Sequence, residues 1–141
     1  MDTEFKKEII IDNYKNPFNK SGSDELNYEK INSNSESCID DIDLYIDIEK
    51  KRIKDIRFNG EACAISTAST SIMLKNIIGK SVNEALDYVN NFLNMVNEEE
   101  YDQDSLGEAI AFDEVYKQSN RKTCVTLPYT GIKKILEKYD V

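Results

Sequence analysis

Aliphatic and polar residues alternate between positions 42 and 49, and this is the clearest pattern in the chain. In IDLYIDIE every second residue is isoleucine or leucine. Because successive side chains of a strand point to opposite faces, the pattern predicts a strand with one buried and one wet face. KKR follows as a turn, and IKDIRF places Ile56 and Phe58 on one face of a second strand. We expect the two segments to form an antiparallel hairpin.

Helical spacing of apolar residues appears on both sides of this hairpin. Residues 3–14 predict a first helix that ends before Pro17, and the residues after Gly60 predict a second helix through position 78, where Gly79 supplies a stop. Ser81-x-x-Glu84 is a capping box, and the amphipathic segment behind it runs to Val96.

Two more helices are predicted towards the C-terminus. Ser105-x-x-Glu108 is a second capping box, which predicts a helix that includes Ile110 and Tyr116. We expect the last helix to begin near Cys124, because Pro128 is tolerated only in the first turn of a helix.

The stretch from the first helix to Cys38 is polar and rich in Asn and Ser, and it predicts a long loop. One helix, then strands, then several helices indicate the α+β class, with helices packed on one face of a small antiparallel sheet of about three strands. The length of 141 residues fits a single domain over 1–141.

Composition narrows the classes of function. The net charge of −9 repels phosphates and disfavours nucleic acid as a partner, and no apolar run is long enough to cross a membrane. The N-terminus lacks an apolar signal core, and the three cysteines are an odd number, so we expect an intracellular, cytoplasmic protein. The complete absence of histidine excludes Ser-His-Asp and Cys-His catalysis, and any metal must be bound by thiolates and carboxylates.

The cysteines lie at junctions between predicted elements rather than inside apolar stripes. Cys38 ends the polar loop, and Cys63 and Cys124 lie close to predicted helix starts, where the helix dipole favours a thiolate. Asp40 follows Cys38 by two positions and shares its side of an extended segment. Three thiolates and one carboxylate make the four ligands of a tetrahedral zinc ion, and the same set suits a small iron–sulfur cluster. Arg121 is positioned to offset the resulting negative charge.

Structural roles are the alternative for all of these residues. Unpaired cysteines of a cytosolic domain are often inert. On this interpretation Ser66 and Ser69 serve close packing or capping. Asp41 and Asp43 would be solvated charges of the strand. Tyr45 and Tyr129 would belong to the core or its rim.

Four segments resemble one known family in the correct order. RFNGEACAISTASTSIM resembles the second cysteine motif of the SufU/IscU/NifU N-terminal family of iron–sulfur assembly proteins, and YKNPFN resembles its N-terminal motif. SCID resembles the first cysteine motif, Cys-Gly-Asp, and RKTCVTLPY resembles the third cysteine segment of the SufU branch. IscU-type members place a histidine directly before the third cysteine, where this chain has Thr123. Arg121 and the long interval between Cys63 and Cys124 also resemble the SufU branch.

The resemblance implies a SufE/NifU-like fold and a zinc-binding sulfur acceptor that works with a SufS-type cysteine desulfurase. It implies Cys38, Asp40, Cys63 and Cys124 as zinc ligands, with Cys38 as the sulfur acceptor. We expect Arg121 to stabilise the anion released or formed in the transfer. The alternative is an IscU-like scaffold that assembles an iron–sulfur cluster and transfers it to another scaffold or to apo-proteins. A globular domain without a metal is the third hypothesis. Whether the chain is an enzyme stays open.

Overall fold

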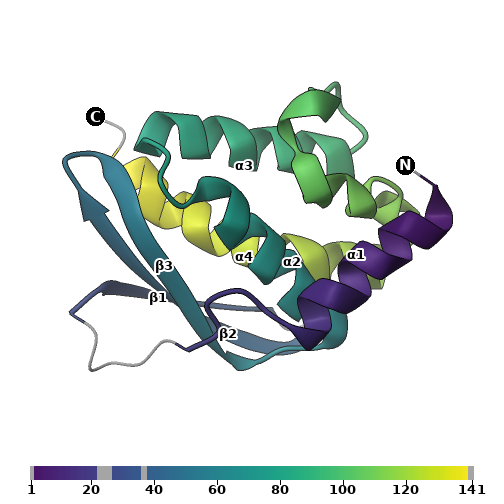
Figure 1. Cartoon of the computed structure of the whole chain (residues 1–141), viewed down its shortest axis with the longest axis horizontal. Helices are drawn as coiled ribbons and strands as arrows, with labels where there is room; N and C mark the ends of the chain where they lie inside the picture. The colour runs from purple at the N-terminus through teal and green to yellow at the C-terminus, as the bar shows by residue number, and fades with distance from the viewer. Residues whose placement is uncertain (1, 22–26, 36–37, 140–141) are drawn as a thin grey trace.

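A three-stranded antiparallel sheet with the order β1-β2-β3 forms one layer of the protein. The computed structural model describes residues 2–21, 27–35 and 38–139, without the side chains of residues 35, 38 and 39. Helices cover one face of the sheet (Figure 1), which confirms the predicted α+β architecture. The strands are β1 (Glu29–Ser35), β2 (Cys38–Glu49) and β3 (Arg52–Glu61).

The predicted hairpin is formed by β2 and β3. Leu44 pairs with Phe58 and Ile46 pairs with Ile56, so the aliphatic positions of both strands face the helices. The turn uses Lys50 and Lys51 in the left-handed region, with φ of 53° and 60°, although neither residue is a glycine. The predicted buried face and the antiparallel pairing of the two segments are therefore confirmed.

Three helices agree with their predicted positions: α1 (Thr3–Lys15), α2 (Ala64–Ile77) and α3 (Val82–Val96). The capping box of α3 is present, because the Ser81 hydroxyl accepts from the Glu84 amide and the Glu84 carboxylate accepts from the Ser81 amide. Gly79 has a φ of +91° just after α2, where a residue with a side chain would be strained.

The loop predicted before Cys38 is wrong over residues 29–35, which form the edge strand β1. This strand has few apolar residues, so its sequence lacks the alternating signal. On its inner face Ser33 is buried, and the Ser33 hydroxyl donates to the Leu127 carbonyl at 2.7 Å. The pairing with β2 and this contact with the last helix supply the stability that the local sequence lacks.

The helix predicted after Ser105 is also wrong, because three short 3₁₀ segments take its place: Gln103–Ser105, Gly107–Phe112 and Val115–Lys117. Gly107 has a φ of +53° and interrupts any continuous helix. Asp102 rather than Ser105 caps the first segment, and Glu108 forms an ion pair with Lys75 at 2.5 Å instead of closing a capping box.

The last helix, α4 (Ser119–Tyr139), begins five residues before Cys124, so its predicted start is wrong. Pro128 lies well inside α4. A proline there has no N–H to donate to the carbonyl of Cys124, four residues earlier, and its ring crowds that carbonyl. The Ser66 hydroxyl of α2 lies 3.0 Å from this carbonyl, next to the cysteines.

The core between the sheet and the helices is apolar and aromatic. Phe92 of α3 stacks on Tyr129 of α4 with ring centroids 3.8 Å apart. The Tyr88 and Tyr129 hydroxyls are 3.1 Å apart, and burial raises the pKa of both, so both remain neutral. In the described part of the chain, none of the helices has the length and apolar character needed to cross a bilayer.

Candidate metal centre

Three side chains with ligand atoms converge where β2, α2 and α4 meet. Asp40 belongs to β2, Cys63 caps α2 and Cys124 lies in the second turn of α4. A carboxylate oxygen of Asp40 and the sulfur atoms of Cys63 and Cys124 all lie within 4.8 Å of one another. The structure thus brings together three of the four residues that the sequence analysis associated with a metal.

Cys63 owes its position to the abrupt change from β3 to α2. Its backbone is extended, with φ of −67° and ψ of 171°, and its sulfur accepts from the Ser66 amide at 3.4 Å as the N-cap of α2. Gly60, just before the end of β3, has a φ of +118°, and a Cβ there would lie 2.2 Å from the Asp41 carbonyl oxygen. The glycine allows β3 to approach β2 closely beside Asp40.

Asp40 is buried, with 2% of its surface exposed. One carboxylate oxygen, Oδ1, accepts from the Cys63 amide at 2.6 Å. The other, Oδ2, lies 3.4 Å from the Cys63 sulfur and accepts from the Ser66 hydroxyl. A carboxylate held in this way has a fixed orientation towards the two sulfurs.

The donor set and its spacing fit a tetrahedral zinc ion. Zinc bonds of about 2.3 Å to sulfur and about 2.0–2.2 Å to oxygen place neighbouring ligand atoms roughly 3.5–3.8 Å apart. The 3.4 Å between Asp40 Oδ2 and Cys63 Sγ is close to this ligand–ligand distance. The sulfur of Cys124 lies within 4.8 Å of both other ligand residues' atoms. Thiolate and carboxylate are ligands that zinc accepts without histidine.

Cys38 is the first residue of β2, and its backbone pairs with Ser35 of β1. It precedes Asp40 by two positions on the same strand. Its side chain lies outside the described part of the structure, so its roles as fourth ligand and sulfur acceptor stay predictions.

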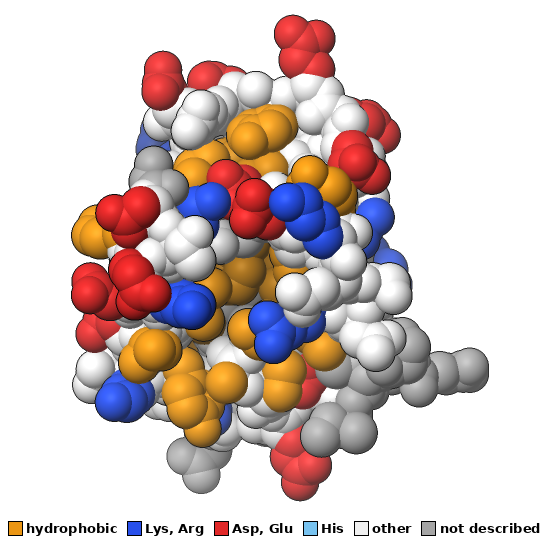
Figure 2. All heavy atoms as spheres, turned by 90° about the vertical axis from the view of Figure 1, so that its right-hand side faces the viewer, with side chains coloured by type: hydrophobic (Ala, Val, Ile, Leu, Met, Phe, Trp, Pro, Cys, Tyr) orange, Lys and Arg blue, Asp and Glu red, His pale blue; other side chains and the backbone are white. Residues whose placement is uncertain are grey.

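Arg121 lies one turn before Cys124 on α4 and is exposed. Among the contacts described for the chain it has no hydrogen bond or ion pair, and it lines a groove of about 160 Å³ between α1, the 3₁₀ segments and the start of α4. Ile65 and Phe112 contribute apolar surface to this groove, and Lys6 contributes charge. Figure 2 shows this end of the molecule, where apolar side chains are exposed between basic and acidic ones. Residues of α2 and α4 line the groove, and the same two helices position Cys63 and Cys124.

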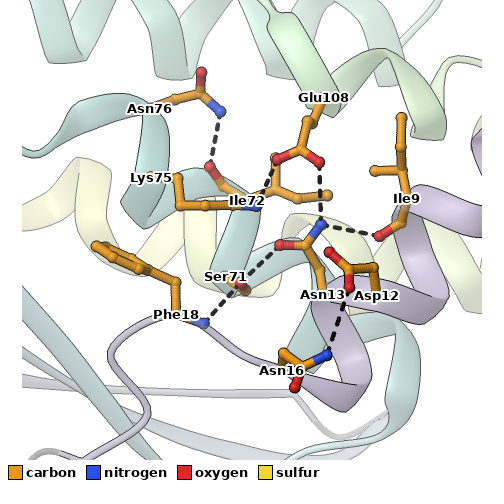
Figure 3. Close-up of polar contacts among 10 residues, drawn as sticks. All are labelled: Ile9, Asp12, Asn13, Asn16, Phe18, Ser71, Ile72, Lys75, Asn76 and Glu108. Carbon is orange, nitrogen blue, oxygen red and sulfur yellow. Dashed lines mark hydrogen bonds and ion pairs between the residues drawn. The ribbon is translucent and has the colours of Figure 1, made fainter.

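Hydroxyl groups on α2 make contacts that the sequence analysis did not assign. The Ser69 hydroxyl donates to the Val125 carbonyl of α4 at 2.6 Å. The Ser71 hydroxyl donates to Asn13 Oδ1 at 2.8 Å and accepts from the Phe18 amide at 2.9 Å, which fastens α1 and the segment after it to α2 (Figure 3). The sequence predicts only packing or capping for Ser69 and assigns no role to Ser71, because local sequence holds no signal for partners so distant along the chain.

A comparison with protein families matches residues 5–125 to the NifU-like N terminal domain. The zinc-dependent sulfurtransferase SufU of Bacillus subtilis (strain 168) is 34% identical over 139 residues, which cover 98% of this chain and 92% of the relative. The iron–sulfur cluster assembly scaffold protein IscU of Streptococcus pyogenes serotype M1 is 35% identical over 131 residues, which cover 92% of this chain and 81% of the relative.

Solved structures agree with this assignment. The crystal structure of FiSufU from the thermophile Fervidobacterium islandicum AW-1 superposes with a TM-score of 0.82 at 35% identity, over 92% of this chain and 94% of that one. A NifU-like protein (N-terminal) from Brucella abortus shares the fold, with a TM-score of 0.80 at 15% identity over 99% of this chain and 98% of that one. From its sequence and its fold, this chain belongs to the NifU-like N-terminal domain family.

Proposed function

We propose that this protein acts in iron–sulfur cluster assembly as a zinc-binding sulfur acceptor for a SufS-type cysteine desulfurase in the cytoplasm, with residues 1–141 as one domain. The observation that carries the proposal is the convergence of Asp40, Cys63 and Cys124. The similarity to the zinc-dependent sulfurtransferase SufU over 98% of this chain supports it. Zinc, when bound, keeps the thiols of its ligands deprotonated.

Cys38 is the acceptor in this proposal because of its place in the fold. Cys63 caps a helix and Cys124 lies inside one, whereas Cys38 begins a strand at the end of a polar segment. The Cys38 thiolate attacks the outer sulfur of the desulfurase persulfide, the sulfur–sulfur bond of the donor breaks, and the desulfurase cysteine leaves as a thiolate. Cys38 then carries the persulfide, and no net oxidation or reduction takes place.

Arg121 assists this step from the rim of the groove. Its guanidinium is exposed and has no ion-pair partner in the described part of the chain. A positive charge one helical turn from Cys124 offsets the charge of the thiolates and of the persulfide anion. We expect Arg121→Ala to lower sulfur transfer while leaving the zinc content unchanged.

Metal content and desulfurase stimulation together test the proposal. We expect about one zinc per chain in the wild type, a loss of most of this zinc in Cys63→Ala and Cys124→Ala, and no stimulation of a SufS-type desulfurase by Cys38→Ala. Persulfide on Cys38 can be detected by mass spectrometry after single turnover. Unchanged stimulation by Cys38→Ala would overturn the acceptor assignment, and a wild type free of metal, with a stability indifferent to chelators, would overturn zinc binding.

A scaffold function is the second candidate, and the similarity to the scaffold protein IscU of Streptococcus pyogenes favours it. Two thiolates and a carboxylate in one place are also suitable ligands for a nascent cluster, which here would be cargo for a downstream scaffold or an apo-protein. Anaerobic reconstitution separates the two functions. A stable cluster that transfers to an apo-acceptor supports the scaffold, and one tightly held zinc without a stable cluster supports sulfur transfer.

A further inference from the structure

Ser66 is a fully buried serine whose hydroxyl reaches all three elements of the metal centre. It lies on α2, three residues after Cys63, and its hydroxyl oxygen is 3.5 Å from the Cys63 sulfur. The same hydroxyl donates to Asp40 Oδ2 of β2 and lies 3.0 Å from the Cys124 carbonyl of α4. One side chain therefore contacts each residue of the cluster.

We infer that Ser66 is the positioning residue of this centre, which holds the Asp40 carboxylate towards the two sulfurs. The inference rests on the proposed metal binding and identifies a residue outside the ligand set that controls it. Partners that orient a ligand are worth as much as 10–100-fold in metal affinity in characterised metal sites.

The contact of Ser66 with the Cys124 carbonyl lies where Pro128 alters the hydrogen bonding of α4. In an unbroken helix this carbonyl would accept from the amide of residue 128, but proline has none. The Ser66 hydroxyl lies beside this carbonyl, at 3.0 Å. The defect in α4 thus links the backbone of one cysteine to the residue that orients the carboxylate.

The hydroxyl has a single proton and two acceptors. A carboxylate is the stronger acceptor because the hydrogen bond to it is charge-assisted, and burial strengthens that bond further. Ser66 therefore donates to Asp40 when the carboxylate is ionised. Rotation of the carboxylate is then restricted at both oxygens, at Oδ1 by the Cys63 amide and at Oδ2 by Ser66.

Ser69 offers a matched control on the same helix. It is also fully buried, and its hydroxyl donates to the next carbonyl of α4, that of Val125, at 2.6 Å. In the described part of the chain, the hydrogen bond of the Ser69 hydroxyl does not involve Asp40, Cys63 or Cys124. Ser69→Ala therefore removes a buried hydroxyl and its contact with α4, whereas Ser66→Ala removes these and the contact with the carboxylate.

The test measures zinc affinity of the full chain by competition with a chromophoric chelator, and the absorption spectrum of the Co²⁺-substituted protein. We expect Ser66→Ala to bind zinc about 10–100-fold more weakly and to change the Co²⁺ bands. We expect Ser69→Ala to match the wild type in both, and Ser66→Thr, which keeps the hydroxyl, to recover the wild-type spectrum. Thermal melting of the metal-free proteins reports how much stability each variant loses.

The outcomes separate this inference from the proposed function. Equal zinc affinity and equal Co²⁺ spectra for wild type and Ser66→Ala would overturn the inference and leave zinc binding intact. Equal losses in Ser66→Ala and Ser69→Ala would overturn it as well, because they would show a packing effect. A wild type that binds neither metal would overturn the proposed function and this inference with it. If Ser66→Ala fails to fold without metal, a Ser66→Thr spectrum unlike that of the wild type would overturn the inference.

Discussion

Both halves of α2 are buried, but the buried side chains of the first half are mostly polar and those of the second half are apolar. The first half, residues 64–71, buries hydroxyl groups, and the second half, residues 72–77, buries aliphatic side chains and a methionine. The buried residues of the first half are Ser66, Thr67, Ala68, Ser69, Thr70 and Ser71, and those of the second are Ile72, Met73, Leu74 and Ile77. The first half lies next to Cys63 and Cys124, and the second half lies in the apolar core.

The difference separates two tasks within one helix. Hydrogen bonds are directional, and the hydroxyls of the first half fix specific atoms of α1, β2 and α4. Every buried side-chain nitrogen or oxygen in the described part of the chain has a hydrogen-bond partner, so these hydroxyls do not destabilise the fold. Apolar burial is non-directional and supplies free energy without selecting one arrangement of ligands. We expect mutation of Ser66 in the first half to change the metal centre, and mutations of the aliphatic residues in the second half to change stability alone.

The largest effect on stability is expected from Leu74→Ala in the second half. Leu74 is fully buried, and truncating such a residue lowers the free energy of unfolding by about 2–5 kcal/mol through lost burial and a cavity. Urea unfolding of the metal-free protein measures this loss. The zinc affinity of the folded variant should equal that of the wild type. A zinc affinity that falls as far as in Ser66→Ala would break the division between the two halves.

Zinc binding should stabilise the fold, and it should stabilise Ser66→Ala less than the wild type. At a free zinc concentration about 100 times the wild-type Kd, bound metal adds about 2.7 kcal/mol to the free energy of unfolding. A variant with a tenfold weaker Kd, such as that expected for Ser66→Ala, gains only about 1.4 kcal/mol at the same zinc concentration. Melting curves with and without a chelator measure both gains. Equal gains in the two proteins would contradict the role of Ser66.

Ser71→Ala should reduce stability without changing the metal centre. The variant leaves the buried Asn13 Oδ1 and the Phe18 amide without their partner, at a cost of about 1–3 kcal/mol. Because both partners belong to α1 and the segment after it, hydrogen exchange of α1 amides should rise first. Thr70→Val is the control, since the hydrogen bond of the Thr70 hydroxyl in the described part of the chain stays within α2, at the Ser66 carbonyl 2.7 Å away. Equal exchange in the two variants would show that Ser71 does not anchor α1.

The second half of α2 and the hairpin could be predicted from the sequence because burial there follows a simple period. Ile42, Leu44 and Ile46 alternate with polar residues on β2, and all three are buried. Aliphatic side chains pack into a core when their spacing places them on one face, and this spacing can be read directly from the sequence. The order of strands, helices and cysteine motifs likewise led to the correct family.

The first half of α2 and its surroundings could not be predicted to the same depth, because their contacts join distant residues. Ser66, Asp40 and Cys124 are far apart along the chain, and a small polar residue at a helix start also fits simple capping. The sequence predicts Pro128 in the first turn of the last helix, whereas α4 begins at Ser119 and has Pro128 in its interior. β1 lacks a strand signal for the same reason, because the hydrogen-bond partner of its buried Ser33 is the distant Leu127 carbonyl.

The smallest effect on stability is expected at the C-terminal end of α4, where Lys138 and Tyr139 donate to Glu29 near the surface. Burial tends to raise the pKa of Glu29, but hydrogen bonds from Lys138 and Tyr139 outweigh it and hold that pKa below its ordinary value of 4.5. Because the folded state lowers this pKa, the contact stabilises the protein above the unfolded pKa and is lost as the pH falls through the folded value.

Lys138 is largely exposed, so screening limits the contribution of this contact to below about 1 kcal/mol. We expect Glu29→Gln to be slightly less stable than the wild type at about pH 6.5 and equally stable at about pH 3, as measured by urea unfolding. High salt should reduce the difference, and zinc affinity should not change. A difference that persists in acid would show that this contact acts through packing, and a change in zinc affinity would show that polar contacts position the ligands even where they are exposed. The comparison within α2 requires that only the buried ones do.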